Sequence, residues 1–383
     1  MKSRTTQGIL AVLGVLLVAG GLLLMQVIVP AMKVFPADVD TTRTFDVAYL
    51  TLLNADTLEF MEFPEGGDHD LRIERNIFVE EVDGNRTLIR ETQTLFNGDT
   101  PLRPPIVKYH ALDRHTMEPL DDVPEEWAAR DGYWEREGLV IGWGIGAEER
   151  DYIGWNDDTR STVEMEYQGK QERGGITTLY FTSEREPELI SEEHAAVLGL
   201  PPSLTIAQLR GLADGMDVSS VDLSDGARAK LTPAIINALR NVEADLQAIP
   251  LVYYYDYYGE YWVEPTTGVL IDTHKYENRG AAFPPEIMDA IREVLENDPN
   301  NQDPEAEDYL PPDIMDQLMP ITVNRFEYVA SEQSVQDAVA DATSNRDRLI
   351  LFGQTIPVVL IVLGVLLAGL AGYFYAQTPV QKS

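Results

Sequence analysis

Two long apolar segments without a charged residue lie at opposite ends of the sequence, over residues 5–32 and 349–380. An α-helix rises about 1.5 Å per residue, so roughly 20 apolar residues cross a hydrocarbon layer of about 30 Å. Helices in the core of a soluble protein seldom run so far without a charged residue. The first segment exceeds the usual apolar core of a signal peptide, and no small-x-small cleavage site precedes Lys33. We therefore predict two membrane-spanning helices, the first of them an uncleaved anchor.

Two spans place both tails on one side of the membrane. Lys2 and Arg4 favour the cytoplasm for the tails, although Arg346 and Arg348 flank the opposite end of the second span. We predict a two-pass protein of the cell membrane with an extracytoplasmic domain. The predicted divisions are a tail 1–7, a span 8–32, a domain 33–330, a stalk helix 331–348, a span 349–376 and a tail 377–383.

The charge of the chain excludes one class of partner. It has 64 acidic against 29 basic residues and a formal net charge of −35, which repels nucleic-acid backbones. A solvated acidic surface explains this charge, and binding of a cation or a basic partner is the alternative. With no cysteine, the chain forms no disulfide, Cys-zinc site or iron–sulfur cluster. No motif indicates a cofactor.

The domain between the spans is predicted to be α+β, a β-rich antiparallel sheet with a helical insertion at 191–248. Strands are indicated by alternating apolar residues and β-branched or aromatic residues. They cover 43–53, 71–82, 87–96, 106–112, 139–143, 161–168 and 176–182. The pair Asp83-Gly84 predicts a hairpin between the second and third of them.

The insertion and the chain after it carry further patterns. Helical spacing covers 203–210 and 232–247, with Thr232 as the expected N-cap and Pro233 at the first helical position. Turns at Gly259 and at 265–268 predict a three-stranded meander over 251–275. The later expectations are a helix 286–296, an exposed loop 297–308, a strand 321–330 and one continuous helix from Ser331 into the second span.

Four short stretches carry a family resemblance: Val34-Phe-Pro-Ala-Asp-Val-Asp-Thr-Thr42, Leu112-Asp-Arg114, the block 137–152 followed by Trp155, and Val263-Glu-Pro-Thr-Thr-Gly-Val-Leu-Ile-Asp272. In these the chain resembles the PorA-type membrane proteins of actinobacteria and archaea, largely a domain of unknown function with a helix–ectodomain–helix layout. The resemblance implies the same layout here. Its porin label implies a pore, but a barrel pore needs strands that face lipid, and the acidic strands here indicate an aqueous domain. The layout is also similar to that of class B scavenger receptors, whose ectodomain conducts lipid.

Catalytic and metal sites are weakly indicated. His110 and His115 fall on opposite faces of a strand, and no serine-hydrolase, zinc-protease or nucleotide-binding motif is present. We predict that the chain is not an enzyme. Irregular cation binding is considered for four acidic residues: Asp157, Asp158, Asp298 and Asp303.

Aromatic residues are densest between Tyr253 and Trp262. Alternation along a strand sends such rings to both faces of a sheet, so packing in the core is one role and contact with a ligand is the other. The candidates for contact with a lipid or glycan are Tyr255, Tyr257, Tyr261 and Trp262.

Small residues recur every four positions in the second span, at Gly364, Ala368 and Gly372. Such residues allow two helix backbones to approach closely. We expect this face to pack against the first span, which offers Ala11, Val15 and Ala19. Homo-oligomerisation through the same face is the alternative.

Three classes of function remain. A membrane-anchored binding or structural module is the main prediction and implies a solid β core. A transport or lipid-transfer protein implies an apolar tunnel towards the membrane. A carboxylate-based hydrolase implies a cleft with clustered acids.

Overall fold

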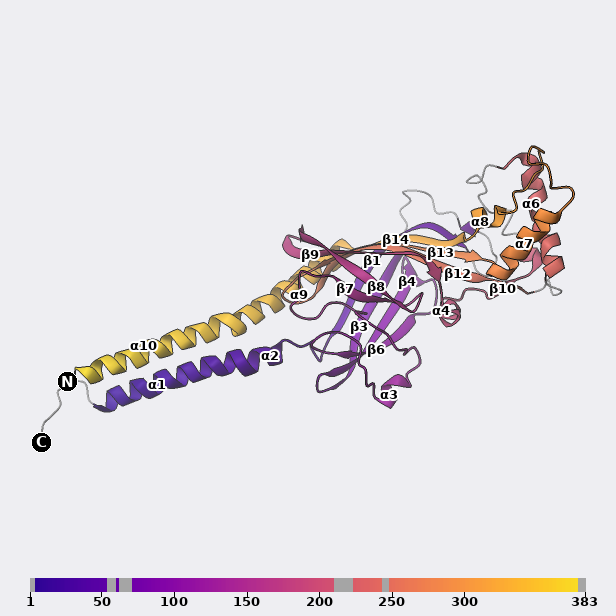
Figure 1. Cartoon of the computed structure of the whole chain (residues 1–383). Coiled ribbons are helices and arrows are strands. Elements are labelled where there is room, and N and C mark those ends of the chain that lie inside the picture. The colour runs from indigo at the N-terminus through magenta and orange to yellow at the C-terminus, as the bar shows by residue number, and fades with distance from the viewer. Residues whose placement is uncertain (1–3, 54–59, 62–70, 210–222, 243–247, 378–383) are drawn as a thin grey trace, which may run out of the picture.

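The computed structural model describes residues 4–53, 60–61, 71–209, 223–242 and 248–377. A long pair of helices, a β body and a group of helices at the far end follow one another along the molecule (Figure 1). The α+β class and the two terminal helices predicted from the sequence are confirmed.

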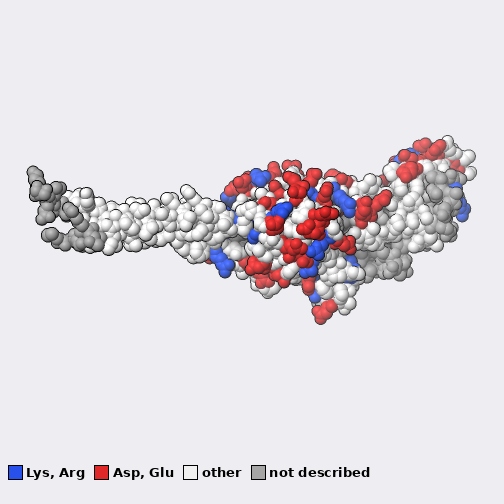
Figure 2. Space-filling view, turned by 90° about the horizontal axis from the view of Figure 1, so that it is seen from below, with Lys and Arg blue, Asp and Glu red and all other residues white. Residues whose placement is uncertain are grey.

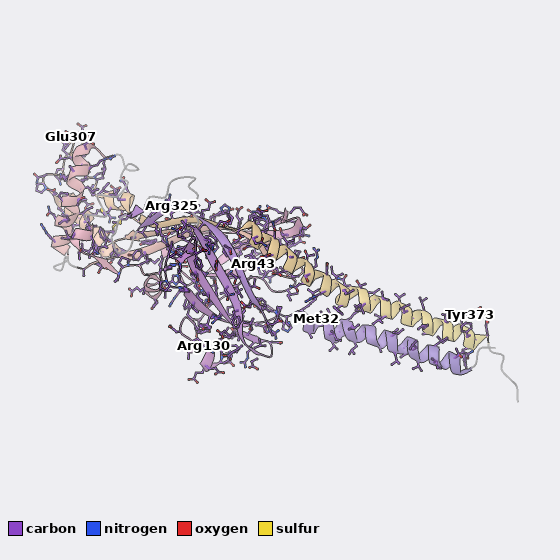
Figure 3. The ribbon with its side chains drawn as sticks, turned by 180° about the vertical axis from the view of Figure 1, so that it is seen from behind. Met32, Arg43, Arg130, Glu307, Arg325 and Tyr373 are labelled. Atoms are coloured by element: carbon purple, nitrogen blue, oxygen red, sulfur yellow. The ribbon has the colours of Figure 1, made fainter. Side chains whose placement is uncertain are left out.

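Both terminal helices are long and apolar enough to cross a membrane, over Thr6–Met32 and Glu332–Ala376. The first consists of α1 (Arg4–Leu23), a π-helical turn and α2 (Val29–Met32). The second consists of α9 (Glu332–Ile350), another π-helical turn and α10 (Ile356–Ala376), so the stalk and the span form one continuous helix. The pair runs side by side from Tyr373 to the β body near Met32 (Figure 3).

Glycines bring the two helices into backbone contact. A Cβ atom added to Gly14 would lie 2.7 Å from the Gly364 carbonyl oxygen, and one added to Gly364 would lie 2.6 Å from that of Gly14. Ala368 belongs to the same contact, because its Cβ would lie 3.1 Å from the Cβ atom added to Gly14. The buried positions recur every seven residues, at Gln7, Gly14 and Gly21 and at Pro357, Gly364 and Ala371, which is the repeat of a coiled-coil seam.

The predicted contact face of the second span, with Gly364, Ala368 and Gly372, is wrong at Gly372. Gly372 is exposed and a Cβ added there would meet nothing within 4 Å, because Ala371 occupies the seam instead. In the first helix Val15 is 63% exposed, and Ala19 is also exposed. Gly14, instead of Val15 and Ala19, packs against the second helix.

We expect Gly364→Leu to separate the two helices, because its side chain would collide with backbone atoms of α1. Overpacking of this kind costs on the order of 1–3 kcal/mol. The thermal unfolding midpoint of the full chain in detergent should fall for Gly364→Leu and stay unchanged for the matched control Gly372→Leu. Equal midpoints for the two variants would contradict the seam.

The β body is a twelve-stranded sheet in which each strand pairs antiparallel with its neighbours. Its path runs β6-β4-β3-β1-β14-β13-β12-β9-β8-β7, with the short strands β2 (Phe60–Met61) and β5 (Thr100–Pro101) beside β1 and β4. The long strands are β1 (Asp40–Leu53), β3 (Leu71–Asp83), β4 (Arg86–Asn97), β6 (Ile106–Asp113), β7 (Tyr152–Asn156), β8 (Ser161–Arg173), β9 (Ile176–Leu189), β12 (Val252–Val263), β13 (Leu270–Ala282) and β14 (Ile321–Ala330).

One segment joins the two edges of this sheet and closes it into a barrel. After the short helix α3 (Glu125–Ala128), the Gly132 carbonyl accepts a hydrogen bond from Tyr109 N of β6 at 3.1 Å. Further on, Leu139 N donates to Ile153 O of β7 at 2.8 Å, and Leu139 O accepts from Trp155 N at 2.9 Å. We call residues 132–139 the closing segment and the sheet with this segment the barrel. The strand expected at 139–143 is therefore only a bridge at Leu139.

The stalk is fixed to the barrel where the chain leaves it. Arg43 of β1 pairs with Asp341 of α9 at 2.6 Å, and Thr44 N donates to Ser334 Oγ at 2.7 Å (Figure 3). Ala338 and Ala342 of α9 pack on Ile271 of β13. The barrel and the second span thus form one mechanical unit.

Helices lie on the side of the barrel away from the helix pair (Figure 1). They are α4 (Glu192–Val197), α6 (Asp225–Val242), α7 (Pro285–Asn297) and α8 (Ile314–Leu318), with β10 (Ser203–Leu204) and β11 (Ile249–Pro250) nearby. α6, α7 and α8 share one apolar core that includes Leu239, Ile291 and Ile314. Part of the predicted insertion, at 210–222 and 243–247, lies outside the described residues.

Two sequence expectations fail in this half of the chain. Thr232 and Pro233 lie inside α6, since burial of Ala227, Leu231 and Leu239 along one face extends the helix back to Asp225. β12 runs through Gly259 without a turn, so the meander has two long strands. Gly259 instead leaves room for Tyr261, whose hydroxyl would lie 2.7 Å from a Cβ atom added there.

Candidate functional site

The end of the barrel nearest the helix pair is filled with apolar side chains. β1 starts shortly after α2, and α9 follows β14 directly, so this end faces the membrane-spanning pair. One cluster there includes Trp143, Phe181 and Val263, and a second includes Ile89 and Met117. These two clusters form a floor to the barrel.

A cavity of about 700 Å³ lies beyond this floor, between the strands. One part of its wall is apolar and comes from the β1, β3, β4 and β14 region, with Phe45, Ile73, Leu71, Leu95 and Phe326. It extends to Leu102 and Arg103, which are exposed near the end of β4, away from the helix pair. The cavity therefore reaches the surface on the side opposite the membrane-spanning helices.

Charged side chains form the rest of the wall. Among the described lining residues, five are cationic, namely Arg75, Arg103, Lys108, Lys275 and Arg279, and four are anionic, namely Glu91, Asp157, Asp158 and Glu277. The outer surface differs, because acidic side chains crowd the visible face of the β body (Figure 2). A chain with a net charge of −35 therefore encloses a cavity in which cations slightly outnumber anions.

Asp157 connects the two edges of the sheet. Its Oδ2 accepts from Lys108 Nζ of β6 at 2.6 Å, while its Oδ1 accepts from Arg136 Nε of the closing segment at 3.1 Å. Trp134 and Trp155 donate their indole N–H groups to the same oxygen at 3.2 Å and 2.9 Å. Burial opposes ionisation of Asp157, but Lys108 and Arg136 outweigh it and hold the pKa of this carboxyl well below its usual range.

A second group lies on β3, β4 and β6. Glu91 accepts from Arg75 Nε at 2.7 Å, and its other oxygen lies 2.8 Å from His110 Nε2. Burial disfavours the ionised form of Glu91, yet Arg75 and His110 lower its pKa well below the ordinary value. Burial and the nearby Arg136 lower the pKa of His110 to about 4, so His110 is neutral at pH 7.

A third group lies on β13. Arg279 donates to both oxygens of Asp158, at 2.8 Å and 3.0 Å, and to Glu277 at 3.1 Å. Lys275 is different, because its Nζ lies 3.8 Å from Glu277 and 5.2 Å and 5.9 Å from the ring centroids of Tyr257 and Tyr261. In the described part of the chain, no acceptor lies within hydrogen-bonding distance of this ammonium group.

The structure places the predicted site residues as follows. Asp157 and Asp158 are held by the ion pairs above, and no group of three or more potential metal ligands occurs among the described residues. Asp298 and Asp303 accept backbone hydrogen bonds from Asn300 and Glu305 in turns after α7. Three of the aromatic candidates, Tyr255, Tyr257 and Tyr261, line the cavity.

Trp262 does not line the cavity, because consecutive strand residues face opposite sides of the sheet. Its ring stacks on Tyr180 with centroids 5.2 Å apart, Arg173 covers it at 4.4 Å, and its N–H donates to Gln171. Trp262 is therefore a packing residue on the outer face of the sheet.

Comparison with known families identifies the chain. The model of the family described as porin PorA matches residues 7–373, which is nearly the whole sequence. The chain belongs to the porin PorA family. A search of curated proteins finds no match. The family match and the two apolar helices together indicate a membrane protein.

Sequence patterns did not single out the charged residues of this PorA-family cavity, such as Arg75, Glu91 and Lys275. Each lies in a strand where charged and apolar residues alternate, as residues that face solvent do. Alternation alone does not tell which face of a curved sheet lines the interior of the barrel. The one usable signal was composition, since Lys275 is one of seven lysines in an acidic chain.

Two buried histidines, one in β6 of the barrel and one in α4, predict a loss of stability in mild acid. Burial lowers the pKa values of His110 and His194 to about 4, from 6.5. Above pH 6.5 both states of the chain carry neutral histidines. Between pH 6.5 and 4 only the unfolded state takes up the protons, so stability falls by up to about 3 kcal/mol per histidine.

We expect the thermal midpoint to fall between pH 7 and pH 5, and to fall less in the double variant His110→Gln, His194→Gln. The exposed His115 provides the control, since His115→Gln should keep the full pH dependence. An unchanged slope in the double variant would show that other groups cause the effect.

Proposed function

We propose that the protein is a membrane-anchored binding protein that holds a small amphipathic molecule in the barrel. The observation that carries this proposal is the cavity of about 700 Å³, with an apolar part and a charged part. Ligand pockets commonly have volumes of about 300–1,000 Å³ with a few polar groups among apolar ones. A solid β core, which would suit a purely structural module, does not agree with this cavity.

Two features favour binding over a pore. The outer face of the barrel is charged where a lipid-facing barrel needs an apolar band of about 25 Å, and the segments suited to lipid are helices. In addition, Trp143, Phe181 and Val263 fill the end of the barrel nearest those helices. A ligand would enter from the opposite end, near Leu102 and Arg103.

The carboxylates favour binding over hydrolysis. A glycosidase needs an acid whose pKa is raised so that it donates a proton. Glu91, Asp157 and Asp158 each pair with a cationic side chain, and their pKa values are lowered although burial opposes this. Such groups stay ionised and position cations.

A fluorescent apolar probe, N-phenyl-1-naphthylamine, tests the proposal with the full chain in phosphatidylcholine nanodiscs. We expect saturable binding to one site per chain. Ile73→Trp fills the apolar part of the cavity and should weaken binding at least roughly tenfold.

Ile153→Trp is the matched control, since Ile153 is 53% exposed on the outside of the barrel and its variant should bind as the wild type does. Binding with equal affinity to both variants would place the probe outside the cavity and refute the proposal.

We further propose that the protein spans a cell membrane and that its barrel lies on the extracytoplasmic side. The acidic surface and the basic Lys2 and Arg4 of the N-terminal tail support this orientation. The chain has no cysteine, so a single introduced thiol reports position without background. Asp121→Cys should react with an impermeant maleimide on intact cells, and Thr6→Cys should react only after lysis. The reverse pattern would invert the topology.

A further inference from the structure

Two unused hydrogen-bond donors lie near one another in the wall of the cavity. Lys275 Nζ lies 5.9 Å from the centroid of the Tyr261 ring and has no acceptor within hydrogen-bonding distance among the described residues, and the Tyr261 hydroxyl has no hydrogen-bond partner there. Their neighbour Tyr257 is satisfied, since its hydroxyl lies 2.7 Å from Ser183 Oγ. A buried donor without an acceptor is costly, and a buried ammonium group is more so.

The backbone explains why these donors meet. Lys275 of β13 pairs with Gly259 of β12, which has no side chain. Tyr261 lies over Gly259, so its hydroxyl enters the space beside the lysine. On the other side of Lys275, Tyr328 pairs with it in register from β14. The lysine thus projects between tyrosine rings.

The carboxylates around Lys275 already accept hydrogen bonds from other groups. Glu277 accepts from Arg279 at 3.1 Å, which it shares with Asp158, and lies within 3.3 Å of the Tyr328 hydroxyl. Glu91 and Asp157 have their own cations at 2.7 Å and 2.6 Å. Burial and the nearby Arg75 lower the pKa of Lys275, but Tyr328, Glu277 and Tyr257 outweigh them and leave the pKa raised, so Lys275 is charged at pH 7. Lys275 thus lies beside Glu277, at 3.8 Å, but donates no hydrogen bond to it.

We propose that Lys275, with the Tyr261 hydroxyl, binds the anionic oxygen group of an amphipathic ligand, a carboxylate or a phosphate. An oxyanion supplies acceptors to both unused donors and forms a hydrogen-bonded ion pair with the ammonium group, whereas a neutral hydroxyl accepts a hydrogen bond without an opposite charge. The apolar tail lies along Ile73, Leu95 and Phe326 in the adjacent part of the cavity. This inference rests on the proposed binding function and names the class of its ligand.

Displacement of the bound naphthylamine probe from the full chain in nanodiscs tests the inference. The three competitors each contain ten carbon atoms: decanoate, decyl phosphate and decanol. We expect the two anions to displace the probe at concentrations roughly 10–100-fold lower than decanol does. The relative potency of the two anions distinguishes a carboxylate from a phosphate site.

Lys275→Met keeps the length of the side chain and removes its charge. It should bind the probe with wild-type affinity, respond to decanol as before and lose the preference for anions. Because its neighbours raise the pKa of Lys275, removal of the charge should lower the thermal midpoint slightly, so the preference for anions and not the midpoint decides the test. Lys170→Met, at a lysine that is 52% exposed and pairs with Glu149, should keep the preference.

Each outcome separates the two proposals. Equal displacement by decanoate and decanol, or an anion preference that survives in Lys275→Met, overturns the anion site while probe binding upholds the cavity. A lower thermal midpoint of Lys275→Met with an unchanged preference would show that the lysine has a structural role only. Absence of saturable probe binding overturns the proposed function and this inference with it.

Discussion

One largely buried carboxylate links the two edges of the barrel. Asp157 accepts hydrogen bonds from Lys108 of β6, from Arg136 of the closing segment and from Trp155 of β7, and without it the buried Lys108 and Arg136 would lose the carboxylate with which they pair. Loss of one member of a buried ion pair typically costs about 3–5 kcal/mol. The cavity needs the two sheet edges to stay joined, so the proposed site depends on Asp157 together with the backbone hydrogen bonds of the closing segment.

The charge of the chain has opposite consequences outside and inside the barrel. Outside, a surplus of acids keeps the domain in water and away from anionic surfaces. Inside, every carboxylate that lines the cavity is matched by arginine or lysine, and the remaining charge is positive. An anion is therefore repelled by the acidic outer surface but attracted by the cationic side chains inside the cavity. Net charge by itself suggested a cationic ligand, and the position of the charges suggests the reverse.

Much of the fold was predictable because length and alternation are local properties. The two spans, the hairpin at Asp83-Gly84 and the continuous helix after Ser331 follow from such patterns. The errors involve tertiary contacts. Gly259 is typical of a turn, but in the structure it leaves space for the Tyr261 side chain. Gly372 has the spacing of a helix contact, but Ala371 is the residue buried in the seam. Lys275 and Trp262 lie near one another on paired strands, yet only the curl of the sheet decides which of them faces the cavity.

The rigid stalk has a consequence for how the cavity exchanges its contents. α9 joins β14 to the second span without a break, and Arg43–Asp341 fixes the first strand to the same helix. The helix pair therefore holds the barrel away from the bilayer, with the apolar floor of the barrel facing the membrane. Lipids that diffuse within the membrane contact the helix pair, whereas molecules in the aqueous space reach the open end of the cavity. Under the proposed binding function, the cavity would therefore exchange its ligand with a soluble donor or acceptor.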